Sequence, residues 1–216
     1  MFSFFPRATF TVLAVVFFLA SNSSADTFTD RMTFESANPN LTTIDFEGIA
    51  PPGDTIQPAP QPWAPAVVFS DPFGTDSIAI SDSAFFFDTP TDALFVNLFD
   101  EPLTATFAET LNGAGGVNAV GFDLAIGFGG LGATIDVFGT GGDLIASESL
   151  DTAIETEFTT FVGFSGLGEI GSLVVTPEAG GFVLIDNFSF GETVPEPAST
   201  TLLAFAAGMA LVRRRR

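Results

Sequence analysis

The sequence predicts an all-β domain, an antiparallel β-sandwich or jelly roll, placed between two terminal segments of a different kind. About ten short runs rich in Val, Ile, Thr and Phe recur within roughly 150 residues. Clusters of Gly, Asn, Asp or Pro separate most of them, for example at 165–169. No helical periodicity is sustained between residue 40 and the C-terminal tail, and no repeat of fixed period is visible. These observations favour two packed sheets over a solenoid, a propeller or a helical fold.

Residues 1–25 have the layout of a secretory signal peptide. Arg7 precedes an apolar run from Ala8 to Ala20, and Ser23-Ser24-Ala25 form a small-x-small pattern before Asp26. We therefore expect export through Sec-type machinery, cleavage after Ala25 and a mature chain that begins near Asp26.

Residues 26–193 form the expected ectodomain, which begins with a helix and then consists of strands. A short helix is expected near residues 30–38. Thr29 or Asp30 can cap its start, and Asn38-Pro39 ends it. The proline-rich stretch 50–65 predicts a long surface loop rather than part of a sheet interior. Later strands are expected at 66–70, 77–81, 94–99, 103–109, 117–126, 133–139, 143–149, 157–164, 170–177 and 181–190.

The composition excludes several kinds of chemistry. The chain has no Cys and no His, which removes disulfides, thiol nucleophiles, Ser-His-Asp catalysis and His-liganded zinc. All 26 acidic residues lie between Asp26 and Glu196, where Arg31 is the single basic residue. A surface so acidic repels phosphate backbones, so no nucleic-acid partner is expected. It can form a solvated face or attract divalent cations.

One acidic residue of the last expected strand is predicted to point into the core. In "GFVLIDNFSF", Asp186 shares a period-two face with Phe182, Leu184, Phe188 and Phe190. A buried carboxylate needs a partner, and the candidates are Arg31, backbone N–H groups or a cation. The alternative is that the faces of this strand are reversed and Asp186 is solvated.

A second acidic strand lies near the start of the ectodomain. In "LTTIDFEG", residues 41–48, Ile44 and Phe46 alternate with Asp45 and Glu47, the pattern of a half-buried strand. "IDFEG" and "LIDNF" resemble the acidic strand ends that hold a structural calcium in carbohydrate-binding jelly-roll modules. The resemblance implies that Glu47 and Asp186, with Asp45 as a further candidate, are Ca²⁺ ligands. A hydrogen-bonded Asp186 without a metal is the alternative.

Two other features leave a ligand-binding role open. Trp63, the single tryptophan, can stack on a sugar ring or fill part of the core. Glycosidase chemistry needs only two carboxylates, and the chain offers many. No individual catalytic residue is predicted.

The C-terminal tail, "VPEPASTTLLAFAAGMALVRRRR", has three parts. Pro195 and Pro197 separate the ectodomain from a charge-free run over 198–212. As a helix this run spans about 22 Å, short of the roughly 30 Å hydrocarbon core of a bilayer. Arg213, Arg214, Arg215 and Arg216 follow at once, and arginines in this position stay cytoplasmic and stop translocation.

This tail, residues 194–216, resembles the PEP-CTERM sorting signal, with Pro195-Glu196-Pro197 as its motif, then a short transmembrane helix and an Arg cluster. The resemblance implies an exopolysaccharide-producing bacterium of the Gram-negative type and an exosortase that processes the chain near the motif. The chain would then be transiently anchored in the inner membrane before it reaches the cell surface or the medium. "TIDFEG", "AVGFDL" and "VLIDNFSFG" also resemble uncharacterised sandwich domains that precede such tails.

The function expected from these features is that of a non-enzymatic surface or matrix protein of the bacterial cell envelope, associated with exopolysaccharide. A lectin domain like a carbohydrate-binding module is the first alternative. Exposed polar groups around Trp63 would favour it. A carboxylate-dependent glycosidase is the second, and it requires two suitably spaced acids in a cleft.

Overall fold

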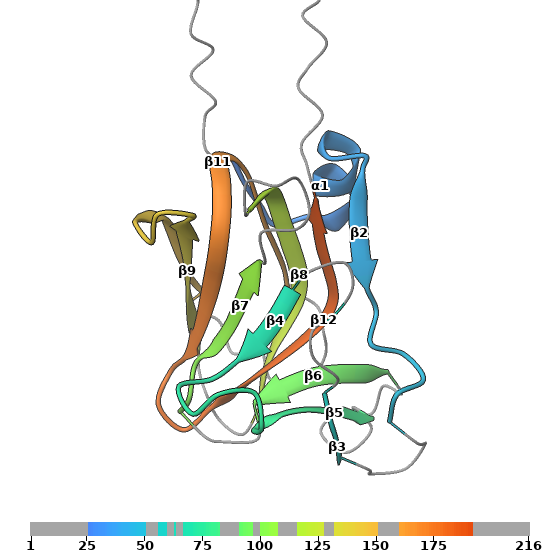
Figure 1. Cartoon of the computed structure of the whole chain (residues 1–216). Helices are drawn as coiled ribbons and strands as arrows, with labels where there is room; N and C mark the ends of the chain where they lie inside the picture. The colour runs from blue at the N-terminus through green and yellow to red at the C-terminus, as the bar shows by residue number, and fades with distance from the viewer. Residues whose placement is uncertain are drawn as a thin grey trace, which may run out of the picture.

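The computed structural model describes residues 26–50, 56–59, 63, 67–82, 91–96, 100–107, 116–127, 132–150 and 160–191 (Figure 1). The expected signal peptide and sorting tail lie outside these residues. The described part consists of antiparallel strands and one short helix, so the all-β prediction is confirmed. Nowhere in the described ranges does a helix have both the length and the apolar character needed to span a bilayer.

The elements follow the chain in this order: β1 (Asp26–Phe28), α1 (Arg31–Ala37), β2 (Leu41–Ile44), β3 (Ile56–Pro58), β4 (Val67–Ser70), β5 (Ile78–Asp82), β6 (Asp92–Val96), β7 (Leu103–Phe107), β8 (Val117–Gly127), β9 (Ala133–Gly139), β10 (Leu144–Leu150), β11 (Thr160–Pro177) and β12 (Phe182–Gly191).

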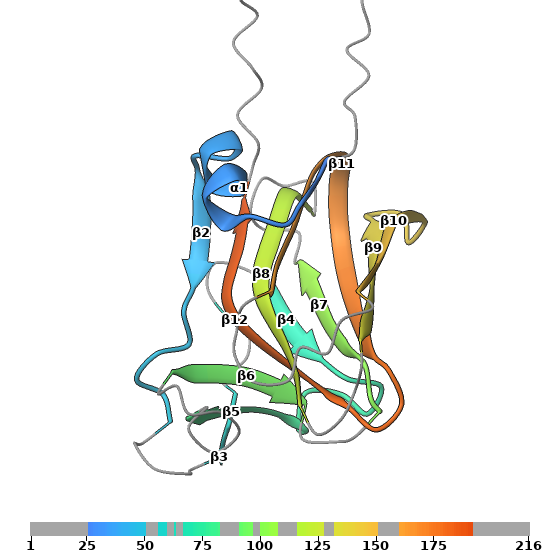
Figure 2. The ribbon, with the colours of Figure 1, turned by 180° about the vertical axis from the view of Figure 1, so that it is seen from behind.

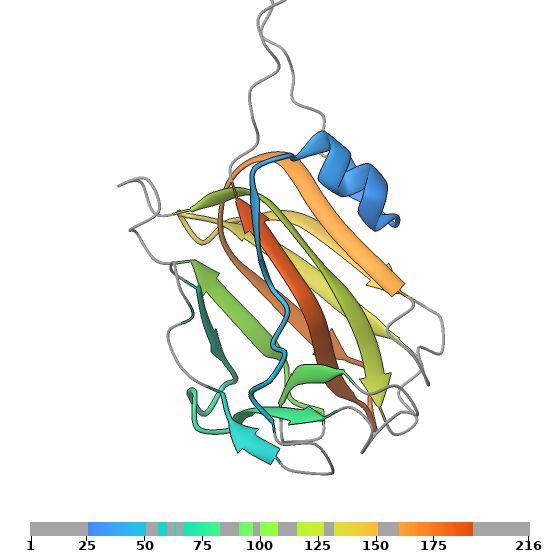
Figure 3. The same ribbon diagram turned by 90° about the vertical axis from the view of Figure 1, so that its right-hand side faces the viewer.

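Hydrogen bonds join these strands into one antiparallel sheet that folds over into two layers (Figure 3). The main path runs β10-β9-β11-β8-β12-β6-β5-β3, and β1, β2, β4 and β7 attach beside it. β11 belongs to both layers. Residues 160–165 pair with β8, whereas residues 172–175 pair with both β7 and β9. The first layer therefore contains β8 and β12, and the second contains β7 and β9.

β11 corrects one detail of the sequence-based prediction. The glycine-rich stretch 165–169 is expected to separate two strands, but a single strand runs from Thr160 to Pro177. Gly166 and Gly168 adopt φ values of 72° and 88°. L side chains rarely adopt this conformation, whereas glycine does so without steric cost. The two glycines thus bend the strand from one layer into the other without ending it.

Two boundaries near the N-terminus also differ from expectation. The strand expected over 41–48 ends at Ile44, because Phe46 takes a positive φ of 56° that is incompatible with a continuing strand. The loop expected over 50–65 contains β3, which pairs with β5 at the end of the sheet path. Pro58 is tolerated there because an edge strand does not need every backbone N–H.

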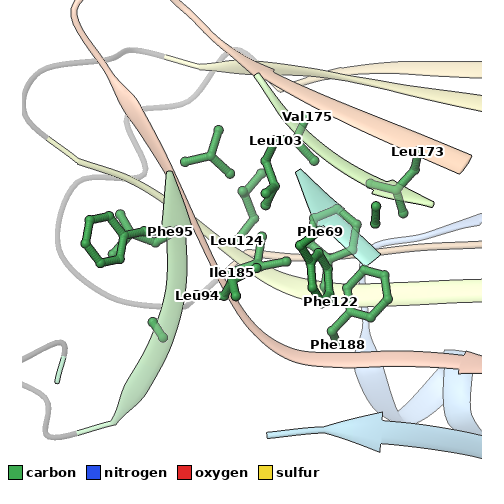
Figure 4. Packing of buried hydrophobic residues seen from close by; sticks show 14 of the residues in the cluster. Phe69, Leu94, Phe95, Leu103, Phe122, Leu124, Leu173, Val175, Ile185 and Phe188 are labelled. Carbon is green, nitrogen blue, oxygen red and sulfur yellow. The ribbon is translucent and has the colours of Figure 1, made fainter. Parts of the chain in front are cut away.

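The core between the layers combines phenylalanine rings with Leu, Ile and Val side chains (Figure 4). The ring centroid of Phe188 in β12 lies 5.1 Å from that of Phe69 in β4 and 6.2 Å from that of Phe107 in β7. It lies 5.9 Å from that of Phe122 in its own layer. All four side chains are buried. Ring pairs at these separations add to the stabilisation from area burial, so Phe188 connects the two layers.

Helix α1 begins and ends as expected. The Asp30 side chain accepts a hydrogen bond from the Thr33 backbone N–H at 2.8 Å, which caps the first turn. The buried Phe34 ring rests on Gly121 of β8 and Gly163 of β11, which are partners in register. A Cβ atom would lie 2.9 Å from the Phe34 ring at Gly121 and 2.8 Å at Gly163. The Phe161 ring is similarly close, at 2.7 Å from the Cβ position of Gly121 and 3.0 Å from that of Gly163, so the two glycines form a notch that admits both rings.

We expect Gly163→Ala to lower the free energy of unfolding by roughly 1–3 kcal/mol, because the added methyl group overpacks the notch. Urea denaturation of residues 26–193 measures the change. In a Phe34→Ala background the same substitution should cost less, because the closest ring contact is gone and the Phe161 ring, 3.0 Å from the Cβ position, can then shift toward the vacated space. Equal costs in both backgrounds would show that the notch does not position α1.

Candidate functional site

Asp186 is buried, as predicted, but it lies on the opposite face of β12 from Phe188 and Phe190. The register partner of Asp186 is Asp123, whereas Phe190 is opposite Val120, so the bulge at Asn187 breaks the period-two pattern that placed these residues on one face. The Asp186 side chain is only 4% exposed, and in β12 it lies between the buried Ile185 and the half-buried Asn187. The alternative in which Asp186 is solvated is therefore wrong, although its face of β12 is the one it shares with Asp123, to which Arg31 is paired. An ionised carboxylate at this depth is costly unless other groups satisfy it.

Hydrogen bonds from two residues reach the Asp186 carboxylate. The Asn187 backbone N–H donates to Oδ1 at 2.6 Å, and the Asn187 side-chain amide donates to Oδ2 at 3.2 Å. The Thr91 hydroxyl is 3.1 Å from Oδ2. Asn187 reaches back in this way because it has a φ of 48° at a β-bulge, where the register of β12 with β8 shifts.

Arg31 is not the partner of Asp186, although it is the single basic residue of the ectodomain. Its Nη2 lies 2.9 Å from Oδ2 of Asp123 and donates to the Asn187 carbonyl at 3.1 Å. Its guanidinium also lies 4.7 Å from the centre of the Phe161 ring. Asp123 stands directly opposite Asp186 in the register of β8 and β12. Like charges opposite one another are destabilising, and Arg31 neutralises only one of this pair.

Glu47 reaches the same place from the segment that follows β2. Thr91 Oγ1 lies 2.6 Å from Oε1 of Glu47 and 3.1 Å from Oδ2 of Asp186. A hydroxyl has one proton, so it can donate to only one of these carboxylates at a time. The other carboxyl group can form a hydrogen bond with this hydroxyl only when it is itself protonated and donates its proton to the hydroxyl oxygen.

Burial raises the pKa of the Asp186 carboxyl to about 6. The hydrogen bonds from Asn187 and Thr91 oppose this rise, while repulsion from Asp123 and Glu47 adds to it. This direction agrees with the geometry, because a proton on Asp186 would allow both carboxylates to bond to Thr91.

The segment that carries Glu47 is also held by hydrogen bonds to its backbone at Ile49 and Ala50. Oδ2 of the buried Asp92 accepts the backbone N–H groups of Ile49 and Ala50 at 3.0 and 3.1 Å. Thr91 and Asp92 at the start of β6 thus hold residues 47–50 against the sheet. Sequence reasoning missed both residues, since a polar pair between turn signals carries no pattern that distinguishes it from a loop.

The residues present assemble only part of the calcium site that the sequence suggests. Glu47 and Asp186 meet at Thr91, but Asp45 is exposed and accepts the Glu47 backbone N–H at 3.3 Å. Asp123 is already paired with Arg31 in a salt bridge. Within the described ranges, no group of three or more Asp, Glu, His or Cys side chains could hold a metal ion. Calcium favours six to eight oxygen ligands, so calcium binding stays a prediction.

Trp63 packs inward. Its ring centroid lies 5.2 Å from that of Phe46 in an edge-on arrangement, and the partly buried side chain packs against the main core. Two backbone hydrogen bonds with Val67 fix its position beside β4. These contacts correspond to the core-filling alternative. Residues 60–62 and 64–66 lie outside the described ranges, so a sugar-binding role for Trp63 also stays a prediction.

The remaining predicted site residues, Pro195-Glu196-Pro197 and Arg213–Arg216, lie outside the described residues. The glycosidase alternative gains no support from Glu47 and Asp186. A side-chain hydroxyl lies within hydrogen-bond distance of both carboxylates, where a glycosidase would hold its substrate.

No protein-family model matches the chain, and no curated protein matches it either. Among solved structures it is similar to TmCBM61, determined in complex with β-1,4-galactotriose. The match covers 59% of this chain and 88% of that chain, at 17% sequence identity and a TM-score of 0.33. A similarity this distant carries no argument about a ligand.

Proposed function

We propose that this is an exported, non-enzymatic protein of the bacterial cell surface or matrix, sorted by its C-terminal tail and associated with exopolysaccharide. The single observation that carries the proposal is the order of features in residues 194–216: the motif Pro195-Glu196-Pro197, a charge-free run and four arginines. The N-terminal signal-peptide pattern supports it independently. We also assign the two-layer ectodomain to the jelly-roll type.

The tail suits a temporary anchor. Arg213–Arg216 resist transfer across the membrane and hold the C-terminus in the cytoplasm. The apolar run before them, about 22 Å long as a helix, is shorter than the hydrocarbon core, so a single span of this length is held less firmly than a full one. An exosortase-type enzyme that cuts near Pro195-Glu196-Pro197 would then release the acidic ectodomain to the cell surface or the medium. The acidic surface keeps the released domain soluble.

Replacing Arg213–Arg216 with serine should send the chain into the periplasm or the medium with its tail uncut, because nothing then stops translocation. Cell fractionation and mass spectrometry of both mature ends measure this. The matched control replaces the same four arginines with lysine, which keeps the charge and should preserve membrane retention. Unchanged fractionation and processing of the serine variant would contradict a sorting role for the tail.

A further inference from the structure

The first and last described residues of the ectodomain lie in one row across the sheet. Asp26 of β1 is opposite Ser165, Ser165 is opposite Ala119, and Ala119 is opposite Gly191 of β12. Gly191 is in turn opposite Leu41, the first residue of β2. Neighbouring strands are about 4.8 Å apart, so Asp26 and Gly191 are separated by about 14 Å. We call the end of the sandwich that contains this row the terminal end.

Both chain ends point outward at the terminal end. β1 runs from the row of Asp26 inward to Phe28, which is opposite Gly163, so the preceding residues attach on the outer side. β12 runs the other way and reaches the row with its last residue, Gly191. α1 lies at the terminal end, while β3, β5 and β6 lie at the opposite end (Figures 1 and 2). The turn that joins β11 to β12 is also at the opposite end, where Phe182 pairs with Gly127.

The linkers to the two apolar segments are short compared with the domain. Six residues, 192–197, separate Gly191 from the apolar run that begins at Ala198, and five residues, 21–25, separate Ala20 from Asp26. A chain extends by at most about 3.5 Å per residue, so these linkers reach at most about 21 and 18 Å. The 11 residues of β8 alone span about 36 Å. Neither linker can pass along the length of the domain to a bilayer at its opposite end.

We propose that the terminal end of the sandwich faces the lipid bilayer while the tail is anchored, and that the end formed by β3, β5, β6 and the β11–β12 turn faces away from it. This inference rests on the proposed anchoring of the tail. It goes further because it assigns a membrane-facing side and an outward-facing side to the ectodomain. The shared row of Asp26 and Gly191 also lets both terminal segments enter the same bilayer before the signal peptide is removed.

The test uses the absence of cysteine from the chain, which allows one fluorophore to be placed at either end. Ala37→Cys labels the end of α1, and Ala179→Cys labels the β11–β12 turn. Both alanines are exposed, so neither substitution disturbs the core. Each labelled full-length chain is reconstituted into vesicles of phosphatidylethanolamine and phosphatidylglycerol that contain a small fraction of acceptor-labelled lipid. Energy transfer to the lipid should be severalfold more efficient from position 37 than from position 179.

Equal transfer from both positions, or stronger transfer from position 179, would overturn the proposed orientation. Vesicle flotation separates this failure from a failure of the proposed function. A full-length chain that floats with the vesicles but shows equal transfer is anchored without the proposed orientation. A chain that does not float overturns both the anchoring and the orientation. Residues 26–193 with the same labels serve as the control that should not float.

Discussion

Asp186→Asn should raise the free energy of unfolding by roughly 1–3 kcal/mol at pH 7.5, measured by urea denaturation of residues 26–193. The carboxylate is 4% exposed, and burial raises its pKa to about 6. An asparagine amide resembles the protonated acid. Its oxygen can accept the Asn187 N–H, and its NH₂ group can donate to Thr91, whose proton is then free for Glu47. The substitution therefore removes the buried charge and keeps the hydrogen bond between β12 and Thr91, while the Asn187 side-chain amide still donates to Oδ2 of Asp123 at 3.0 Å.

The gain from Asp186→Asn should depend on pH in a defined direction. Because the pKa of Asp186 is higher in the folded state than its ordinary value of 3.8, the folded chain binds the proton more tightly than the unfolded chain. The wild type keeps this stabilisation below pH 3.8 and loses it as the pH rises through about 6. The two proteins should thus be similar near pH 4 and diverge up to about pH 7.

Asp76→Asn is the matched control, because Asp76 is exposed and its replacement removes the same charge from the same acidic domain. General relief of repulsion would stabilise both variants equally, and salt would weaken the effect in both. A gain confined to Asp186→Asn identifies burial as the cause. If Asp186→Asn instead destabilises the domain at pH 7.5 in the presence of a chelator, the carboxylate is a net stabilising group and its burial cost is smaller than we infer.

If calcium binds at Asp186, then in the presence of Ca²⁺ the substitution Asp186→Asn should lower the stability of the domain relative to the wild type rather than raise it. An ion bound only by the folded chain adds about 2.7 kcal/mol at a hundredfold excess over its Kd. If Glu47 and Asp186 ligate Ca²⁺, millimolar Ca²⁺ should raise the melting temperature of the wild type but not of Asp186→Asn. Sodium at equal ionic strength must not reproduce the rise. Equal responses of the two proteins to Ca²⁺ would contradict the predicted site.

In residues 41–48 the period-two pattern predicts which side chains are inside more reliably than where the strand ends, whereas in β12 the bulge at Asn187 moves Phe188 to the other face from Asp186. The pattern places Ile44 and Phe46 inside, and both are buried. However, it does not predict that the strand ends at Ile44, since burial at alternate positions continues through the turn at Phe46. The same limit applies to β11. Gly166 and Gly168 have the composition of a turn, and only pairing with strands of both layers keeps them in one strand.

The candidate site was predictable in its acidic residues but not in their partners. Asp186 and Glu47 stand in the stretches "LIDNF" and "IDFEG", whose resemblance to calcium-holding strand ends implied that they lie close together. Thr91, which joins them, is 95 residues away from Asp186 in the chain and has no periodic neighbours. The sequence also offers Arg31 as a partner for Asp186, whereas the β-bulge at Asn187 lets the Asn187 carbonyl and Asp123 bind it instead. Such pairings depend on register, which the sequence pattern does not specify.

The largest loss of stability is expected from Phe188→Ala, because this ring is fully buried and contacts rings from both layers of the sandwich. Removing a buried phenylalanine side chain costs about 3–5 kcal/mol, through lost transfer energy and the cavity that remains. Phe73→Ala is the matched control. It removes the same atoms from a side chain that is 74% exposed, so it should change the free energy of unfolding by less than about 0.5 kcal/mol. Urea denaturation of both variants at pH 7.5 measures the difference. Similar values for the two would mean that β4 and β7 do not pack against β12, and the two-layer arrangement would then be wrong.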